Sequence, residues 1–253
     1  LEAGQYKMDL EGLKNIINPA SKVLILCNPH NPGGRVWTRQ ELIDIAEICY
    51  EHKILVISDE IHSDLAFAPH KHIPFASVSE KAAQNSITFM APSKTFNIAG
   101  IVSSYSIIPN DELRKKFNKY LESSELDEGH IFAYLAAQIA YEHCDEWLAQ
   151  AKDYIWNNIK LVDEYLKANI PQIKAMTPEA SFLVWLDCRE LNLSQKALVS
   201  LFVDDAKLAL NDGEMFGQGG EGYMRLNVGT PLANIQKALD NLKKAVNAKQ
   251  IHD

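Results

Sequence analysis

The chain has 253 residues, of which 47% are hydrophobic and 23% are charged, and its formal net charge is −8. This length allows a sizeable core in one or two domains, and the composition is that of a globular chain rather than a disordered or fibrous one. The acidic balance predicts that neither nucleic acid nor a membrane is a partner, and no apolar run in the sequence is long enough to span a bilayer.

The first half of the sequence alternates strand and helix patterns. Residues 23–27 form a continuous apolar run, which predicts a strand buried on both faces. Thr38 is expected to begin a helix, because Glu41 completes a capping box with it. Further strands are predicted at residues 54–58, 86–90 and 101–108. This β-α-β order predicts an α/β fold with a parallel sheet.

The second half predicts a long helix followed by a smaller α+β region. Asp145 is expected to cap this helix, whose apolar stripe continues to Leu166. The predicted domains are residues 1–144, a connecting helix at 145–168, and a small C-terminal domain at 169–253. In that last domain we expect strands at 182–186, 208–210 and 223–228, a helix from 194 to about 205, and a final helix capped by Thr230.

The four cysteines are scattered along the chain without Cys-x-x-Cys spacing. They stand at positions Cys27, Cys49, Cys144 and Cys188. This spacing contains no zinc-binding pattern, so no metal is expected. We expect buried free thiols, as in proteins of the reducing cytoplasm.

Polar residues follow the predicted strands at points suited to chemistry. Asn31 lies on a turn after the first strand, Asp59 and His62 lie at the end of the second, and Lys94 follows the third. An amide, a carboxylate and an amine delivered by strand ends are the groups that a pyridoxal phosphate site needs. Arg225 lies in a later strand-like run, where a buried guanidinium requires a partner.

Each of these residues also has a purely structural interpretation. Lysines are mostly solvated surface charges, and aspartate and asparagine are common in turns or as helix caps. His62 at a helix start is then a solvent-facing residue, and Arg225 a member of a structural ion pair. The Gly-rich segment 217–222 precedes a strand and is interpreted as a flexible loop rather than a dinucleotide fingerprint.

Four motifs in this order resemble the class I and II pyridoxal phosphate enzymes, which share the fold of aspartate aminotransferase. They are Asn-Pro-His-Asn-Pro-Gly at 28–33, Ser-Asp-Glu-Ile-His at 58–62, Ser-Lys-Thr-Phe-Asn-Ile-Ala-Gly at 93–100 and Met-Arg-Leu-Asn-Val-Gly at 224–229. The resemblance extends from about Tyr6 to about Val246. His62 stands where ordinary aminotransferases of this class have tyrosine, so the chain is most similar to the cystathionine β-lyase-type C–S lyases.

The resemblance implies pyridoxal 5′-phosphate as the cofactor and a fold type I architecture, with a partial large-domain sheet whose fourth strand is antiparallel. It implies that Lys94 forms a Schiff base with the cofactor and later takes the substrate Cα proton, while Asp59 keeps the ring nitrogen protonated. Asn31, preceding a cis peptide bond, and His62 would contact the ring oxygen, and Ser93 would touch the phosphate.

The resemblance also assigns Arg225 to the substrate, whose α-carboxylate it would grip in a bidentate manner. Two positions depart from the common pattern of the class. Ala91 stands where serine or threonine is frequent, and Val102 stands where many aminotransferases have arginine. The C–S lyase branch tolerates both changes.

The function expected is therefore that of a C–S β-lyase, which converts L-cystathionine or a cysteine S-conjugate to thiol, pyruvate and ammonia. An aminotransferase is the first alternative. The second is a truncated, inactive fragment, because the chain opens on Leu1 with sequence typical of the middle of a domain. A small amino acid as substrate, a homodimer for the full-length protein and a cytoplasmic location complete the expectation.

Overall fold

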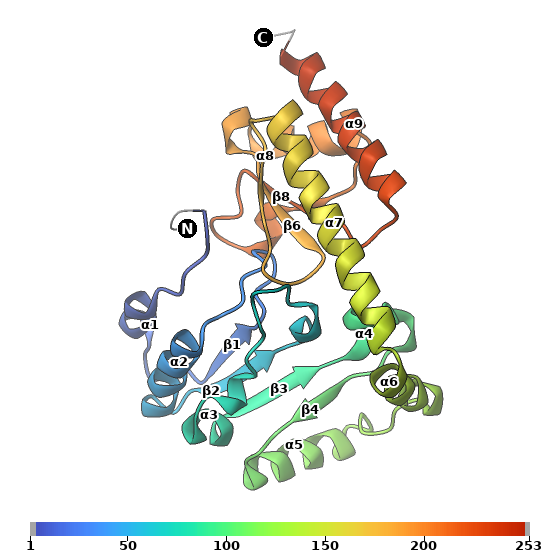
Figure 1. Cartoon of the computed structure of the whole chain (residues 1–253). Helices are drawn as coiled ribbons and strands as arrows, with labels where there is room; N and C mark the ends of the chain where they lie inside the picture. Colours follow the sequence, from blue (N-terminus) through green and yellow to red (C-terminus); the bar gives the residue numbers. More distant parts are fainter. Residues whose placement is uncertain (1–3, 251–253) are drawn as a thin grey trace. The chain divides into compact units, whose positions relative to one another are not determined.

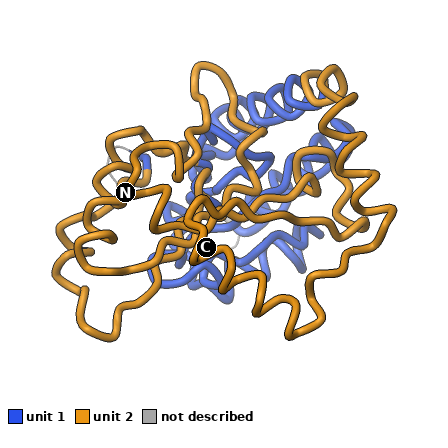
Figure 2. Tube along the Cα trace, turned by 90° about the horizontal axis from the view of Figure 1, so that it is seen from below, with its two compact units in different colours: residues 1–5, 31–34, 151–253 blue, residues 6–30, 35–150 orange. Residues whose placement is uncertain are grey.

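The computed structural model describes residues 4–250 (Figure 1). The chain divides into two compact units (Figure 2). Unit 1 comprises residues 1–5, 31–34 and 151–253, and unit 2 comprises residues 6–30 and 35–150. The short segment 31–34 thus belongs to the same unit as the C-terminal part of the chain, although it lies early in the sequence.

Unit 2 is built on a four-stranded sheet in the order β1-β2-β3-β4 (Figure 1). The strands are β1 (Val23–Cys27), β2 (Leu55–Asp59), β3 (Ser86–Met90) and β4 (Tyr105–Ile107). The helices are α1 (Leu10–Ile16), α2 (Arg39–Glu51), α3 (Glu80–Gln84), α4 (Pro92–Thr95), α5 (Asp111–Ser123) and α6 (Ile131–His143). Strands β1, β2 and β3 pair in parallel and β4 pairs antiparallel to β3, so the predicted topology is confirmed.

Helix α2 illustrates how local sequence sets an element of unit 2. The side chain of Thr38 accepts a hydrogen bond from the Glu41 N–H, and the Glu41 carboxylate accepts one from the Thr38 N–H at 2.7 Å. This confirms the predicted capping box, which satisfies N–H groups that a helix start leaves free. The apolar face of α2 then packs into a core that includes Leu26, Leu42, Ile45, Cys49 and Val56.

The prediction that the first strand is buried on both faces is wrong. Strand β1 lies at an edge of the sheet, and alternate side chains differ in exposure: Leu26 is buried, whereas Ile25 is 75% exposed. Successive side chains of a strand point to opposite faces. One face of β1 meets the core beneath α2, and the other face has no covering layer among the described residues.

Unit 1 contains a second four-stranded sheet, in the order β5-β6-β8-β7, with every pair antiparallel. Its strands are β5 (Lys174–Met176), β6 (Leu183–Asp187), β7 (Asn211–Asp212) and β8 (Tyr223–Asn227). Its helical elements are α7 (Asp145–Asn169), which begins in unit 2, the short α8 (Gln195–Ser200) with the π-helical turn η5 (Leu201–Asp205), and α9 (Leu232–Gln250). Trp185 and Tyr223 stack across β6 and β8 with ring centroids 5.2 Å apart.

Three predicted details of this region differ in the structure. Residues 208–210 are not a strand, because the Leu208 N–H donates to the Phe202 carbonyl and the chain turns there; pairing with β8 begins only at Asn211. Asp145 is the first residue of α7 rather than the residue before it. Likewise, α9 begins at Leu232, so Thr230, the predicted cap, lies two residues before the helix. The strand β5 was not predicted, since its three residues carry too short a pattern.

Candidate functional site

The carboxyl ends of the parallel strands in unit 2 are aligned around Asp59. In the sheet register, Asp59 of β2 lies opposite Cys27 of β1 and Phe89 of β3. The Asp59 carbonyl accepts the Asn28 N–H at 2.9 Å, and the Asp59 side chain is exposed, with Oδ1 accepting the Ile61 N–H at 3.2 Å. The aspartate thus presents its carboxylate at the edge where polar groups of parallel strands meet.

Lys94 lies on the short helix α4, directly after β3. Its side chain is exposed and makes no ion pair or hydrogen bond within residues 4–250. Ser93 beside it is half-buried, and its carbonyl accepts the Ile98 N–H at 3.1 Å. The flanking residues Pro92 and Thr95 are buried. Buried residues therefore hold α4 in place on both sides of Lys94, and the Lys94 amine is accessible to a ligand.

His62 is not the solvent-facing residue of the structural interpretation. It precedes the 3-10 turn η1 (Ser63–Leu65) and is only 4% exposed, and its carbonyl accepts the Leu65 N–H at 3.0 Å. A buried imidazole three residues after Asp59 has its ring orientation restricted by packing. This restriction suits a hydrogen-bonding role better than a surface role.

Glu60 forms a buried network that the sequence did not predict. Its carboxylate is fully buried and accepts hydrogen bonds from the Ser58 hydroxyl at 2.8 Å and the Phe75 N–H at 2.8 Å, and lies 2.7 Å from Nε2 of His72. This network ties the segment 72–75 to the end of β2, next to Asp59. The only sign of this network in the sequence is the Asp-Glu pair at a strand end. The partners His72 and Phe75 lie 12 and 15 residues further along the chain.

Asn31 and Arg225 come together within unit 1. The Arg225 Nη1 donates to Oδ1 of Asn31 at 2.8 Å, although the two residues are 194 positions apart. The Asn31–Pro32 peptide bond is cis, as expected. Gly34 has φ +68°, and a Cβ there would lie 2.3 Å from Cβ of Pro178, so only glycine fits this approach of the loop to residues 178–180.

The guanidinium of Arg225 is held by neutral groups. Its Nη2 donates to Oδ1 of Asn211 at 2.7 Å, and its Cζ lies 4.6 Å from the centroid of the Phe216 ring. Within residues 4–250 it forms no ion pair with a carboxylate, so the interpretation as a structural ion pair is not supported. Partial burial lowers the pKa of Arg225, yet arginine remains charged at neutral pH. Its positive charge is therefore available for an anion.

The structure thus places the predicted site residues in two groups. Unit 2 carries Asp59, His62, Ser93 and Lys94, and unit 1 carries Asn31 and Arg225. Of the two departures from the family pattern, Ala91 is buried directly before α4. Val102 is 83% exposed with φ +54°, a conformation that is unfavourable for a β-branched residue.

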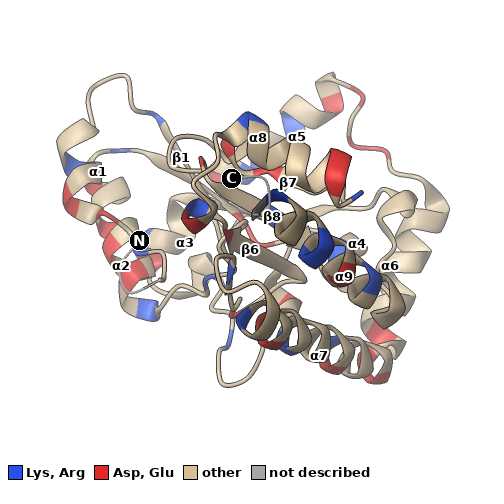
Figure 3. Ribbon diagram, turned by 90° about the horizontal axis from the view of Figure 1, so that it is seen from above, with Lys and Arg blue, Asp and Glu red and all other residues tan. Residues whose placement is uncertain are grey.

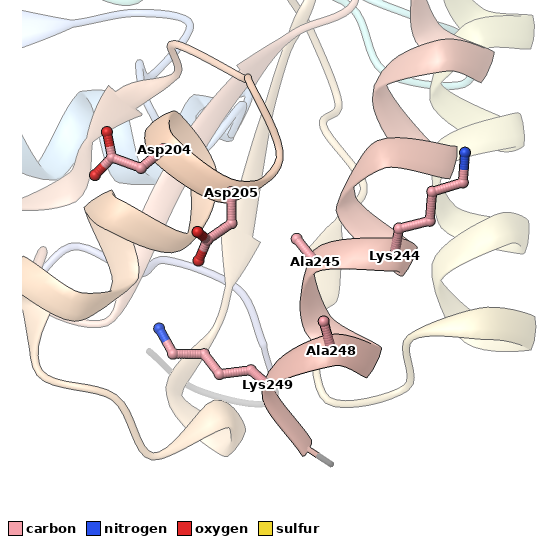
Figure 4. Close-up of a pocket in the computed structure, with 6 residues that line it drawn as sticks. All are labelled: Asp204, Asp205, Lys244, Ala245, Ala248 and Lys249. Atoms are coloured by element: carbon pink, nitrogen blue, oxygen red, sulfur yellow. The ribbon is translucent and has the colours of Figure 1, made fainter. Parts of the chain in front are cut away.

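A surface pocket elsewhere in unit 1 contains none of these residues. It has a volume of about 520 Å³ and is lined by Asp204, Asp205, Lys244, Ala245, Ala248 and Lys249. Figure 4 shows the two aspartates on one helical turn and the other four residues on α9. Charges of both signs are also interspersed along α7 (Figure 3). These are ordinary solvated surfaces without a convergent set of catalytic groups.

Two further classes of site find no support in the part of the chain that the structure describes. Residues 4–250 contain no cluster of three or more histidine, cysteine or acidic side chains that could hold a metal ion. Over the same range, no helix combines the length and the apolar character needed to cross a membrane.

Comparison with known sequences identifies relatives over nearly the whole chain. The family described as aminotransferase class I and II matches residues 2–242. Cystathionine beta-lyase PatB of Bacillus subtilis (strain 168) is 43% identical over 244 residues, which cover 96% of this chain and 63% of that protein. Protein MalY of Escherichia coli (strain K12) is 32% identical over 98% of this chain and 63% of its own length.

Solved structures agree with these relatives. A putative aminotransferase from Clostridium difficile 630, with pyridoxal phosphate bound, superimposes with a TM-score of 0.95 at 42% identity, over 98% of this chain and 64% of that one. Cystalysin from Treponema denticola, which contains the same cofactor, also has a TM-score of 0.95, at 36% identity over 98% of this chain and 63% of its own. The chain thus spans a little under two thirds of the length of the relatives it matches.

Proposed function

Because this chain belongs to the class I and II aminotransferase family, we propose that it is part of a pyridoxal phosphate-dependent C–S β-lyase. The reaction is cleavage of L-cystathionine or a related cysteine S-conjugate, with uptake of one water molecule, to a thiol, pyruvate and ammonia. The observation that carries the proposal is the buried His62 after Asp59, in a chain 43% identical to a cystathionine beta-lyase.

The chemistry of the available side chains fits this cofactor. Lys94 has an exposed amine that no described residue engages, and Asp59 exposes a carboxylate at the neighbouring strand end. When bound, pyridoxal phosphate supplies an electron-withdrawing ring that stabilises negative charge at the substrate Cα. We assign Lys94 to hold the cofactor covalently and Asp59 to keep its ring nitrogen protonated. Ser93 is assigned to the phosphate.

The remaining residues orient the reactants. Asn31 and His62 are assigned to the ring oxygen of the cofactor, the first through its amide and the second through its imidazole. Arg225 is assigned to the substrate α-carboxylate, and its guanidinium charge, balanced by no described carboxylate, supports this role. With the substrate so oriented, Lys94 Nζ, displaced from the cofactor by the substrate amine, would take the Cα proton while the Cβ–S bond breaks and the thiolate departs.

Asn31 and Arg225 belong to unit 1, whereas Asp59, His62, Ser93 and Lys94 belong to unit 2. Independently of this division, we propose that residues 1–144 belong to a cofactor-binding large domain. Residues 145–168 form the connecting helix, and residues 169–253 form a small C-terminal domain.

An aminotransferase is the second candidate. It is supported by the 42% identity of this chain to the putative aminotransferase from C. difficile. Both candidates use the same cofactor and the same lysine, so they differ in the fate of the substrate. A third candidate is an inactive fragment of such an enzyme.

The deciding experiment supplies L-cystathionine to the full-length protein in which this sequence occurs. We expect pyruvate and thiol to be released, and Lys94→Ala to abolish both. Lys119→Ala, which removes an exposed lysine on α5, is the matched control and should keep full activity. Transfer of the amino group to a 2-oxoacid with cystathionine left intact would favour the aminotransferase. A second arm gives the cofactor to the 253-residue chain alone, and failure to bind it there would favour the inactive fragment.

We further propose that the full-length protein is a cytoplasmic homodimer. Four free cysteines support a reducing compartment. Association is supported by large apolar side chains that are exposed along α6, namely Ile131, Phe132, Tyr134, Leu135 and Ile139. Sedimentation analysis of the full-length protein is the test, and a monomer at micromolar concentration would contradict it.

A further inference from the structure

The hydrogen bond between Asp64 and Thr95 joins two segments that carry proposed catalytic residues. Asp64 lies in η1, two residues after His62, and Thr95 directly follows Lys94 in α4. The Thr95 hydroxyl donates to Oδ2 of Asp64 at 2.9 Å. Both segments belong to unit 2, and they are 31 residues apart in the sequence.

Helix α4 needs such an anchor because it is very short. It comprises Pro92–Thr95, and Ala91, the residue before it, provides no side-chain cap. Isolated helices of this length are unstable in water, so tertiary contacts must hold its orientation. Thr95 is only 2% exposed, and its hydroxyl donates a hydrogen bond to the Asp64 carboxylate. A hydrogen bond to an ionised carboxylate is stronger and more directional than one between neutral groups.

A second contact fixes the other side of the same turn. Phe96 packs edge-on against Tyr141 of α6, with ring centroids 5.2 Å apart and an interplanar angle of 90°. The Tyr141 hydroxyl lies 3.1 Å from that of Tyr105. Burial raises the pKa of Tyr141, and the hydrogen bond and charge of Tyr105 and, least, the charge of Asp64 add to this.

Asp64 has no other described function. Within residues 4–250 it makes no ion pair, and Thr95 is the partner of its carboxylate. Its contact leads to the residue next to Lys94.

We propose that Asp64 is a positioning residue for Lys94: through Thr95 it fixes the helix that presents the lysine amine beside the strand end carrying Asp59 and His62. This inference rests on the proposed role of Lys94. Asp64 itself touches neither cofactor nor substrate in this proposal. Loss of the contact lets α4 reorient, and a displacement of about 1 Å costs up to about a hundredfold in rate.

The test compares Thr95→Val, Thr95→Ser and Asp64→Asn in the full-length protein. Valine keeps the shape of threonine and removes the hydroxyl, whereas serine keeps the hydroxyl. Thr88→Val is the matched control, because Thr88 is equally buried in β3 and its hydroxyl has no hydrogen-bond partner in the described range. Urea unfolding identifies conditions in which every variant is folded.

Three readouts are then measured on the folded variants. Borohydride fixation of pyridoxal phosphate onto Lys94 is followed by mass spectrometry, the visible absorbance of the bound cofactor is titrated against pH, and kcat and KM are determined for pyruvate release. We expect Thr95→Val to slow fixation and lower kcat by about tenfold or more with little change in KM, and to shift the titration midpoint. Asp64→Asn should act in the same direction, and Thr95→Ser should restore wild-type values.

The outcomes distinguish failure of the positioning role of Asp64 from failure of the proposed lyase function. Wild-type fixation rate, kcat and titration midpoint in a folded Thr95→Val variant would overturn the positioning role and leave the lyase proposal intact. An effect of the same size in Thr88→Val would also overturn it, because generic core disturbance would then explain the result. Absence of any adduct on Lys94 in the wild-type protein would refute the proposed function itself, and the inference with it.

Discussion

At the scale of single residues, the buried Glu60 carboxylate holds together the segments next to Asp59 in the candidate site. Its carboxylate has no exposure and satisfies the Ser58 hydroxyl, the Phe75 N–H and the His72 ring. A buried carboxylate that lost these partners would be strongly destabilising, and the partners in turn depend on it. The alternation of a strand end sends Glu60 inward and leaves the adjacent Asp59 exposed.

Glu60→Ala is therefore expected to lower the free energy of unfolding by about 3 kcal/mol, because it leaves several buried polar groups unsatisfied. Equilibrium unfolding in urea measures this. Glu51→Ala, at an exposed helix end, should change the free energy by less than about 0.5 kcal/mol. Equal effects of the two substitutions would show that the Glu60 network contributes little.

His30 predicts a specific acid sensitivity. Its ring lies between Tyr6 and Trp37, with centroid distances of 5.3 and 5.7 Å, and burial lowers its pKa to about 4. The unfolded chain binds a proton at a pKa of about 6.5, so acid favours unfolding. The contribution of His30 to stability is complete above that pH and is lost as the pH falls from about 6.5 to about 4.

His30→Phe should remove part of this acid sensitivity. Comparing the free energy of unfolding at pH 7.5 and 4.5, we expect the wild-type protein to lose up to about 3 kcal/mol more than the variant. His52→Gln, which changes an exposed histidine after α2, serves as the control and should keep the wild-type pH dependence. Parallel pH profiles for His30→Phe and the wild-type protein would contradict this assignment.

At the scale of elements, Asn158 connects the long helix α7 to the end of β8. Its amide donates to the carbonyl of Val228 at 2.9 Å and to that of Thr230 at 3.0 Å, and it is almost fully buried within an otherwise apolar helix face. Without it, two carbonyls that follow β8 would lose their donor. The sequence offered no sign of this role, because the partners lie 70 and 72 residues away.

Asn158→Ala should destabilise the protein by about 2 kcal/mol, since two hydrogen bonds to buried or partly buried carbonyls are lost. The adjacent Asn157 is exposed, so Asn157→Ala tests the same chemical change without these bonds and should be nearly neutral. Thermal unfolding of the two variants side by side is the measurement. A larger loss for Asn157→Ala would overturn the argument.

At the scale of the whole molecule, each unit contains a buried cysteine whose reactivity can be used to follow the unfolding of that unit. Cys49 is fully buried in unit 2, where burial raises its pKa to about 11, and Cys188 is buried in unit 1, where burial likewise raises its pKa. Cys27 and Cys144 are half-buried, so the prediction that all four thiols are buried is wrong for these two.

Native labelling with iodoacetamide should therefore modify the half-buried Cys27 and Cys144 and leave Cys49 and Cys188 unmodified, because only an accessible thiolate reacts. Increasing urea should expose the two buried thiols as their units open. Mass spectrometry of each cysteine peptide gives the two transitions independently. Rapid modification of Cys188 in the native protein would contradict the burial described above.

The sequence alone determined the features that depend on neighbouring residues and on recurring motifs. The α/β class, the parallel pairing of the first three strands, the helix start at Thr38 and the family were all predictable. Periodicity, capping and motif order can be recognised in the sequence itself, because they do not depend on how distant segments pack.

Only the tertiary structure decided which distant groups meet and which apolar faces are covered. The contact of Arg225 with Asn31, the bond between Thr95 and Asp64 and the exposure of Ile25 at a sheet edge are of this kind. Such contacts depend on strand order and on packing between segments far apart in the chain. Whether an apolar residue of a strand is buried or exposed depends on which segments pack against it, and the local sequence pattern does not specify those segments.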